Sequence, residues 1–332
     1  LEELMFWANY NIIWGNPSYR NHEEGLFKSY QIRGQAWSLR TLGQVAYITP
    51  DDHLLKNYFN DIVNQNLNYY SNRYLVDATT MNPLGFVTEN YAFPYDGGRG
   101  HTAWMDDMLT WSIGYLKALD FQNADALLEW KATSCIERMT NQDYCWILGM
   151  PYSLIVRDSS TDPLYTTFAE VYDATVNLKY PAVVGLECGS QAMADALGFS
   201  LGQTNGGPTD PESYTANIQS ALAVATETTN PNAALAWQVF ENRSVKPNYA
   251  IAPQFAIVPF ENTALSISDE VFNNTISIFP NPTANTFTID FGNEILEKVI
   301  IYNELGQKIK EIPIAIGTNE VNISNLSNGI YF

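Results

Sequence analysis

Apolar residues recur with the period of an α-helix along most of the first 260 residues. In residues 31–47 the apolar side chains share one helical face, while Arg33, Trp37 and Arg40 form a second stripe at similar spacing. A helix with two such stripes is expected to be covered on both sides. The same periodicity predicts helices over residues 1–14, 31–47, 54–70, 102–121, 124–139, 169–177, 184–202, 214–227 and 233–242.

Short connections separate several of the predicted helices, and long helices joined in this way pack as antiparallel hairpins. Successive hairpins with an apolar back and a polar, aromatic front are typical of an α/α toroid or an open helical array. Residues 1–260 are therefore predicted to form a mainly α body of helical hairpins. We expect it to be toroid-like and incomplete at its N-terminus, because the sequence begins inside a predicted helix. An irregular helical bundle is the alternative, since no fixed-period repeat distinguishes the two.

The period of the apolar residues changes to two near the end of the chain. A polar stretch at residues 261–274 is predicted to be a linker. After it, alternating apolar residues indicate short strands, and a loop that ends at Gly306 is typical of a β-hairpin because glycine tolerates positive φ. The alternation falls at residues 276–278, 287–291, 298–302, 307–312 and 321–326. Short strands at this spacing predict a small all-β sandwich over residues 275–332, so the chain is expected to be multidomain.

The chain carries a formal net charge of −19, with 17 Lys and Arg against 36 Asp and Glu. This charge would repel a phosphate backbone or an anionic membrane surface, so nucleic acid is not an expected partner. No stretch approaches the ~20 apolar residues that a membrane span needs. Aromatic residues make up 13% of the chain, and their Trp and Tyr side chains suit both helix packing and stacking on sugar rings.

The three cysteines, Cys135, Cys145 and Cys188, lack the spacing of metal ligands, so no metal or other cofactor is predicted. An odd count leaves at least one thiol without an internal partner. A bridge between Cys135 and Cys145 is one expectation for an oxidising compartment, and buried free thiols are the alternative.

Three motifs near the end of the chain occur in a fixed order. The first is Ile-Phe-Pro-Asn-Pro-Thr at residues 278–283, followed by Phe-Thr-Ile at 287–289. The second is Val-Ile-Ile-Tyr-Asn-Glu-Leu-Gly-Gln at 299–307, and the third is Val-Asn-Ile-Ser-Asn-Leu-Ser-Asn-Gly-Ile-Tyr-Phe at 321–332. In this order the motifs resemble the C-terminal sorting domain of type IX (Por) secretion substrates in Bacteroidetes.

The resemblance covers residues 275–332 and implies recognition by the type IX secretion machinery of the outer membrane. It also implies that the tail is usually removed and that the protein is released or attached at the cell surface. Family members usually continue a few residues beyond Gly-Ile-Tyr-Phe, whereas this sequence ends at Phe332, so the domain is expected to be C-terminally truncated. An accessory sandwich that binds a partner or a glycan is the alternative.

The richest set of chemically active side chains lies in residues 88–107, a glycine-containing loop and the helix that it opens. A glycoside hydrolase would use two carboxylates, one as proton donor and one as base or nucleophile. A polysaccharide lyase would neutralise a uronate with Arg99 and take its proton with Tyr91 or His101. The catalytic candidates are Glu89, Tyr91, Asp96, His101 and Asp107, and the substrate-binding candidates are Arg33, Trp37, Arg99, Trp104 and Trp111.

Each of these candidates also has a purely structural interpretation. Asp106 and Asp107 would complement the helix dipole and cap the first turn. Arg99 and His101 would satisfy the carbonyl groups of a buried loop. The aromatic candidates would pack in a core rather than stack on a sugar.

The paired helical faces, the aromatic content and the resemblance of the tail together predict a secreted or cell-surface protein, exported across the outer membrane. Its body is predicted to act on polysaccharide as a hydrolase or a lyase, by general likeness to α/α-toroid carbohydrate-active proteins. A non-catalytic glycan-binding or structural surface protein is the alternative. Convergence of the candidate side chains in one concave pocket would favour the enzyme.

Overall fold

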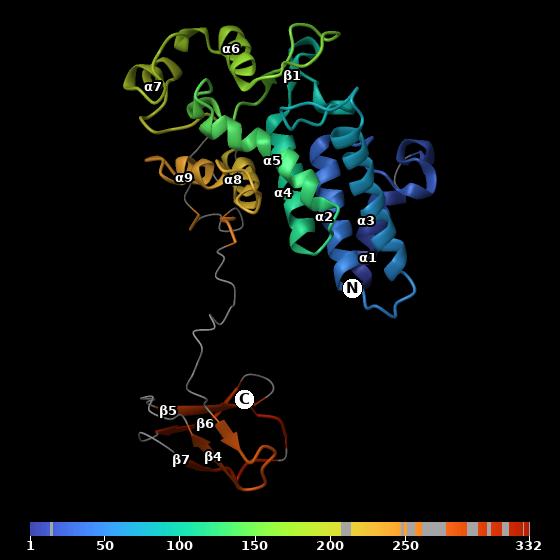
Figure 1. The fold of residues 1–332 in the computed structure, drawn as a ribbon, viewed down its shortest axis with the longest axis vertical. Helices are drawn as coiled ribbons and strands as arrows, with labels where there is room; N and C mark the ends of the chain where they lie inside the picture. The colour runs from blue at the N-terminus through green and yellow to red at the C-terminus, as the bar shows by residue number, and fades with distance from the viewer. Residues whose placement is uncertain are drawn as a thin grey trace. The chain divides into compact units, whose positions relative to one another are not determined.

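The computed structural model of the chain divides into two compact units, Leu1–Phe260 and Glu261–Phe332, which are described separately (Figure 1). The structure describes residues 1–13, 16–206, 214–246, 249–250, 256–260, 277–290, 298–303, 307–313, 319–327 and 329–331. The predicted linker at 261–274 and the predicted hairpin loop at Gly306 lie outside these residues.

The first unit is mainly helical, which confirms the predicted class of the body (Figure 1). Within the described residues, no helix is long and apolar enough to cross a membrane. The helices are α1 (Glu2–Ile13), α2 (Ile32–Ile48), α3 (Lys56–Ser71), α4 (Ala103–Ala118), α5 (Ala124–Thr140), α6 (Phe168–Lys179), α7 (Gln191–Leu197), α8 (Tyr214–Ala225) and α9 (Ala233–Glu241).

The helix predicted over residues 184–202 is too long, because only Gln191–Leu197 forms α7. Gly189 adopts a positive φ before this helix, and Gly198 does so directly after it. Positive φ interrupts a right-handed helix. The side chain of Ser190 accepts a hydrogen bond from a backbone amide of the first turn and so caps α7 at its observed start.

Helix α4 lies between neighbours that come from different parts of the chain. It packs between α2 and α8, and its hairpin partner α5 packs between α3 and α9. Glycines permit the close approach, because a Cβ at Gly43 of α2 would overlap Leu116 and a Cβ at Gly114 of α4 would overlap Val224. The hairpins α2–α3, α4–α5 and α8–α9 therefore place α2, α4 and α8 in one row and α3, α5 and α9 in a second row.

Two short strands hold the loop that opens α4. Strand β1 (Gly100–His101) pairs antiparallel with β2 (Leu154–Ile155), and α6 packs against β2. At Gly100 there is no room for a Cβ beside the carboxylate of Asp96. The loop that carries most of the candidate residues is thus fixed by a segment from far along the chain.

The disulfide of the first unit joins Cys145 to Cys188, so the predicted bridge between Cys135 and Cys145 is wrong. Cys135 is a buried free thiol. It lies on α5 within an apolar cluster that this helix forms with α8 and α9, whereas Cys145 lies beyond the end of the helix. The disulfide fastens the segment that precedes α7 to the segment that follows α5.

The second unit consists of short strands, as the alternating pattern predicts (Figure 1). The strands are β3 (Ser277–Phe279), β4 (Thr286–Asp290), β5 (Lys298–Tyr302), β6 (Lys308–Pro313) and β7 (Asn319–Asn322). One antiparallel sheet has the order β3-β4-β7, and the pairing of β5 with β6 in a second sheet confirms the predicted hairpin. Ile289, Ile301 and Val321 come from both sheets and are buried in one apolar cluster.

Candidate functional site

Helices α2 and α4 present a set of arginine and tryptophan side chains that is accessible to solvent. Because α2 packs against its neighbours through Ala36, Leu39 and Gly43, the stripe with Arg33, Trp37 and Arg40 is left outside this packing. On α4, Trp104 and Trp111 are partly exposed and lie two helical turns apart. We call the five residues Arg33, Trp37, Arg40, Trp104 and Trp111 the aromatic face.

The two arginines of the aromatic face lie over the two tryptophans of α4. The guanidinium carbon of Arg33 is 5.5 Å from the ring centroid of Trp104, and that of Arg40 is 5.5 Å from the ring centroid of Trp111. These are cation–π distances. Trp37, one turn after Arg33, keeps 49% of its surface exposed.

Neither arginine of the aromatic face pairs with a carboxylate among the described residues. Nε of Arg33 donates a hydrogen bond to the side-chain oxygen of Gln31 at 3.2 Å, and Nε of Arg40 has no hydrogen-bond partner in the part of the chain that the structure describes. Helix α2 contains no acidic residue at all. Two cations that pair with no described carboxylate therefore lie on one face of the body, in a chain whose net charge is −19.

Tyrosines extend the aromatic face toward the loop that opens α4. The rings of Trp104 and Tyr152 have centroids 6.2 Å apart, and those of Tyr152 and Tyr95 are 4.8 Å apart. The hydroxyl groups of Tyr95 and Tyr152 are joined by a hydrogen bond of 2.7 Å. Tyr152 is 46% exposed, so its ring adds accessible aromatic surface beside Trp104.

Asp96 lies in the same loop, and two side chains contact its carboxylate. It forms an ion pair of 2.8 Å with Lys179 and accepts a hydrogen bond of 2.9 Å from the hydroxyl of Ser153. Partial burial opposes its ionisation, but hydrogen bonds from Lys179 and Ser153 outweigh this effect and hold the pKa of Asp96 below its ordinary value. Nε of Arg99 donates to the backbone oxygen of Asp96 at 3.0 Å. Arg99 therefore stabilises the loop.

Glu89 and Tyr91 precede this loop and occupy different surroundings. Glu89 forms an ion pair of 2.9 Å with Arg73 of the turn after α3 and accepts a hydrogen bond from the hydroxyl of Tyr69. Burial and the bond to Glu89 raise the pKa of Tyr69. Tyr91 is 53% exposed.

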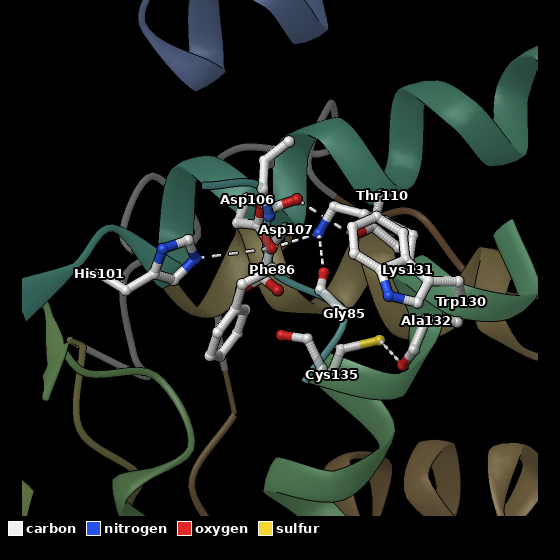
Figure 2. Close-up of polar contacts among 12 residues, drawn as sticks. Gly85, Phe86, His101, Asp106, Asp107, Thr110, Trp130, Lys131, Ala132 and Cys135 are labelled. Carbon is white, nitrogen blue, oxygen red and sulfur yellow. Dashed lines mark hydrogen bonds and ion pairs between the residues drawn. The ribbon is translucent and has the colours of Figure 1, made fainter. Parts of the chain in front are cut away.

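His101, Asp106 and Lys131 form a buried polar cluster between the start of α4 and α5 (Figure 2). Nε2 of His101 lies 3.6 Å from Oδ2 of Asp106, and Lys131 pairs with the same oxygen. The ammonium of Lys131 also donates to the backbone oxygen of Gly85 at 2.8 Å. Burial opposes ionisation of Asp106, but the charge of Lys131 outweighs it and keeps the pKa of Asp106 below its ordinary value.

Asp107 forms a second buried pair, with Arg138 of α5. Both terminal nitrogens of Arg138 donate to this carboxylate, and one of them also donates to the backbone oxygen of Gly149 at 2.7 Å. Burial opposes the charge of Arg138, but Asp107 outweighs it and raises the pKa of Arg138. Asp106, which lies in the first turn of α4, and Asp107 are therefore both ion-paired across to α5.

The structure brings only part of the predicted set together. Arg33, Trp37, Trp104 and Trp111 lie on the aromatic face, and Asp96 lies in the loop whose Tyr95 extends it. His101 is fully buried and Asp107 is 2% exposed, so neither reaches this surface. Among the described residues, no group of three or more His, Cys, Asp or Glu side chains could hold a metal ion.

Sequence reasoning missed Tyr152, Lys179 and the two cations of α5. Tyr152 and Lys179 reach the loop only through the pairing of β1 with β2 and the packing of α6, which no periodicity reveals. Lys131 and Arg138 could have been found, because they lie seven residues apart in the predicted helix over 124–139 and therefore share one face.

Residues 277–332 match the family model of the secretion system C-terminal sorting domain. The second unit therefore carries a sorting domain of the type IX kind, which interacts with the secretion machinery and directs the chain to the cell surface or the medium. No curated protein and no solved structure matches the chain at a significant level.

Proposed function

We propose that the helical body is a glycan-binding module that acts outside the cell and holds an acidic polysaccharide on the aromatic face. One observation carries this proposal. Arg33 and Arg40 lie over Trp104 and Trp111 without a carboxylate partner in the described part of the chain, although acidic residues outnumber basic ones twofold. The sorting domain supplies the extracellular address at which such a polymer is met.

The chemistry of the aromatic face suits a carboxylated sugar. A pyranose ring presents apolar C–H groups that stack on Trp and Tyr, and its carboxylate matches the planar fork of a guanidinium. Arg33 and Arg40 are seven residues apart, which is about 10 Å along the helix axis. Two carboxylates carried by alternate units of one extended polymer therefore fit the two guanidinium groups.

Binding is better supported than hydrolysis because the carboxylates of the loop are already paired. A glycosidase needs two carboxyl groups, one of them with a raised pKa, on either side of the bond that it breaks. Asp96 instead has a lowered pKa beside Lys179, and Glu89 is held by Arg73. Burial raises the pKa of Asp107, but this carboxyl group is paired with Arg138 in the interior and cannot reach a substrate on the surface. The proposal therefore assigns no catalytic role to Glu89, Tyr91, Asp96, His101 or Asp107.

The architecture supports an extended binding surface. The row of α2, α4 and α8 and the row of α3, α5 and α9 support an α/α toroid-like arrangement, in which the first row lines the inner side. In the second unit, two small sheets that share one apolar cluster support a β-sandwich. Both architectures remain part of the proposal.

The test is the affinity of the full chain for tetragalacturonate by isothermal titration calorimetry. The double variant R33Q/R40Q is expected to bind at least about 100-fold more weakly, because each charge-assisted hydrogen bond contributes about 1.5–3 kcal/mol. The control K246Q/K308Q removes two charges from exposed ion pairs and is expected to bind like the wild type.

Equal affinity of R33Q/R40Q and the wild type, or a wild type that binds no acidic oligosaccharide, would contradict the proposal. The same incubations are read for new reducing ends and for absorbance from new double bonds. Either product would show that the body is an enzyme.

A further inference from the structure

A hollow of about 480 Å³ opens between α1 and α2, next to the aromatic face. Its volume lies within the range of small-molecule sites in proteins. The residues that line it are Trp7, Tyr10, Asn11, Tyr30, Gly34, Trp37, Ser38 and Thr41. None of them carries a charge, in contrast to the arginines on the other side of Trp37.

The walls of the hollow are accessible aromatic rings. Trp7, Tyr10 and Trp37 are 51%, 46% and 49% exposed. The rings of Trp7 and Tyr10 are 6.0 Å apart and nearly perpendicular, so they form a corner and not a flat stack. Such a corner offers two faces to a ring-shaped ligand with apolar C–H groups.

Short polar side chains complete the lining. The amide of Asn11 and the hydroxyl of Ser38 are neutral polar groups among these rings. The hydroxyl of Thr41 donates to the backbone oxygen of Trp37 at 2.9 Å and keeps its acceptor capacity. Neutral donors and acceptors between aromatic walls suit a sugar that carries hydroxyl groups and no charge.

Trp37 borders both the hollow and the arginines of the aromatic face. At about 100° per residue, Gly34, Ser38 and Thr41 lie on nearly the opposite side of α2 from Gly43, which touches α4. Helices α1 and α4 therefore flank α2. A glycan chain that crosses α2 would meet the hollow on one side of Trp37 and the guanidinium groups on the other.

From this geometry we infer that the hollow between α1 and α2 is a subsite for an uncharged pyranose unit. The inference rests on the proposed function and adds the class of its ligand. The preferred polymer contains neutral as well as acidic sugars, with a neutral unit between Trp7, Tyr10 and Trp37 and an acidic unit at Arg33.

Gly34 allows the hollow to be filled without disturbing the fold. A Cβ at this position would meet only the Cβ of Tyr30, at the ordinary distance of 3.5 Å. A leucine side chain at Gly34 therefore extends into the hollow, and replacing a helical glycine raises helix propensity. The matched control G34A shares the gain in propensity and leaves most of the hollow open.

The experiment measures the affinity of the full chain for neutral tetrasaccharides of β-1,4-linked glucose, mannose and xylose by isothermal titration calorimetry. At least one of them is expected to bind the wild type and G34A. G34L is expected to bind it at least about tenfold more weakly, because the aromatic walls are no longer accessible. Thermal melting of G34L at or above the wild-type temperature confirms that the fold is intact.

Binding of G34L within about threefold of the wild type would overturn the subsite, as would a wild type that binds none of the three sugars. Tetragalacturonate separates this failure from that of the proposed function. If G34L and the wild type bind neutral sugars equally while R33Q/R40Q no longer binds tetragalacturonate, the inferred neutral subsite is wrong and the proposed acidic site is supported. If R33Q/R40Q binds tetragalacturonate as tightly as the wild type does, the proposed function itself is wrong.

Discussion

Two pairs of opposite charges are buried between α4 and α5, although only 17 of the 332 residues are Lys or Arg. A buried ion pair recovers little free energy overall, but the loss of one partner leaves an uncompensated charge in the interior. Lys131 and Arg138 each also donate to a backbone oxygen, so they fix the turn at Gly85 and the turn at Gly149. These residues hold the start of α4, where Trp104 begins the aromatic face.

Because His101 is buried in this cluster, the stability of the folded protein is expected to depend on pH. Burial lowers its pKa below the ordinary value of 6.5, and Asp106 only partly opposes the effect, so the folded protein keeps His101 neutral. Below about pH 6.5 the unfolded chain binds a proton that the folded chain does not, and stability falls by up to about 1.4 kcal/mol per pH unit. Above pH 6.5 this contribution is constant.

Urea unfolding of the wild type and of H101F between pH 7.5 and about 5 tests this dependence. Phenylalanine keeps a ring against Phe86, whose centroid is 4.1 Å from that of His101, and removes the titrating group. H101F is expected to lose less stability than the wild type as the pH falls. H22Q, which removes an exposed histidine, is the matched control. Parallel curves for H101F and the wild type would show that His101 does not titrate in this way.

The elements of the body differ in how far the sequence predicts them. The stripes of α2 and α4 identify both helices and the five members of the aromatic face, because side chains that share a helical face are set by local geometry. The periodicity predicts a helix from residue 184, but Gly185 and Gly189 at positive φ prevent a right-handed helix before α7. The partners of Asp96 and the place of Tyr152 depend on strand pairing between distant segments, which no local pattern encodes.

The disulfide between Cys145 and Cys188 is expected to hold the segment around α7 on the body. It closes a loop with a sequence separation of 43 residues. On the chain-entropy model, this closure destabilises the unfolded state by about 4 kcal/mol. The double variant C145S/C188S should therefore unfold at lower urea concentration by an amount that corresponds to up to about 4 kcal/mol.

The variant C135S is the control for this measurement, because Cys135 is a free thiol. A reducing agent should lower the stability of the wild type and leave C145S/C188S unchanged. If the reducing agent destabilises both proteins equally, the bond does not contribute in this way.

On the scale of the whole molecule, two units have separate tasks. The sorting domain at residues 277–332 directs export, and its motifs could be read from the sequence because they lie in consecutive short segments. The function of the body cannot be identified from consecutive motifs in this way, because its aromatic face combines residues about 70 positions apart in the sequence, such as Arg33 and Trp104. Only the packing of α2 against α4 brings them together.

We propose that a carboxylated glycan binds on the aromatic face. A crystal structure of the full chain with bound tetragalacturonate tests this claim most directly. We predict carboxylates within hydrogen-bonding distance of the guanidinium groups of Arg33 and Arg40, and sugar rings against Trp37 and Trp104. A tetragalacturonate bound elsewhere on the body, with Arg33 and Arg40 still without an acidic partner, would contradict the account.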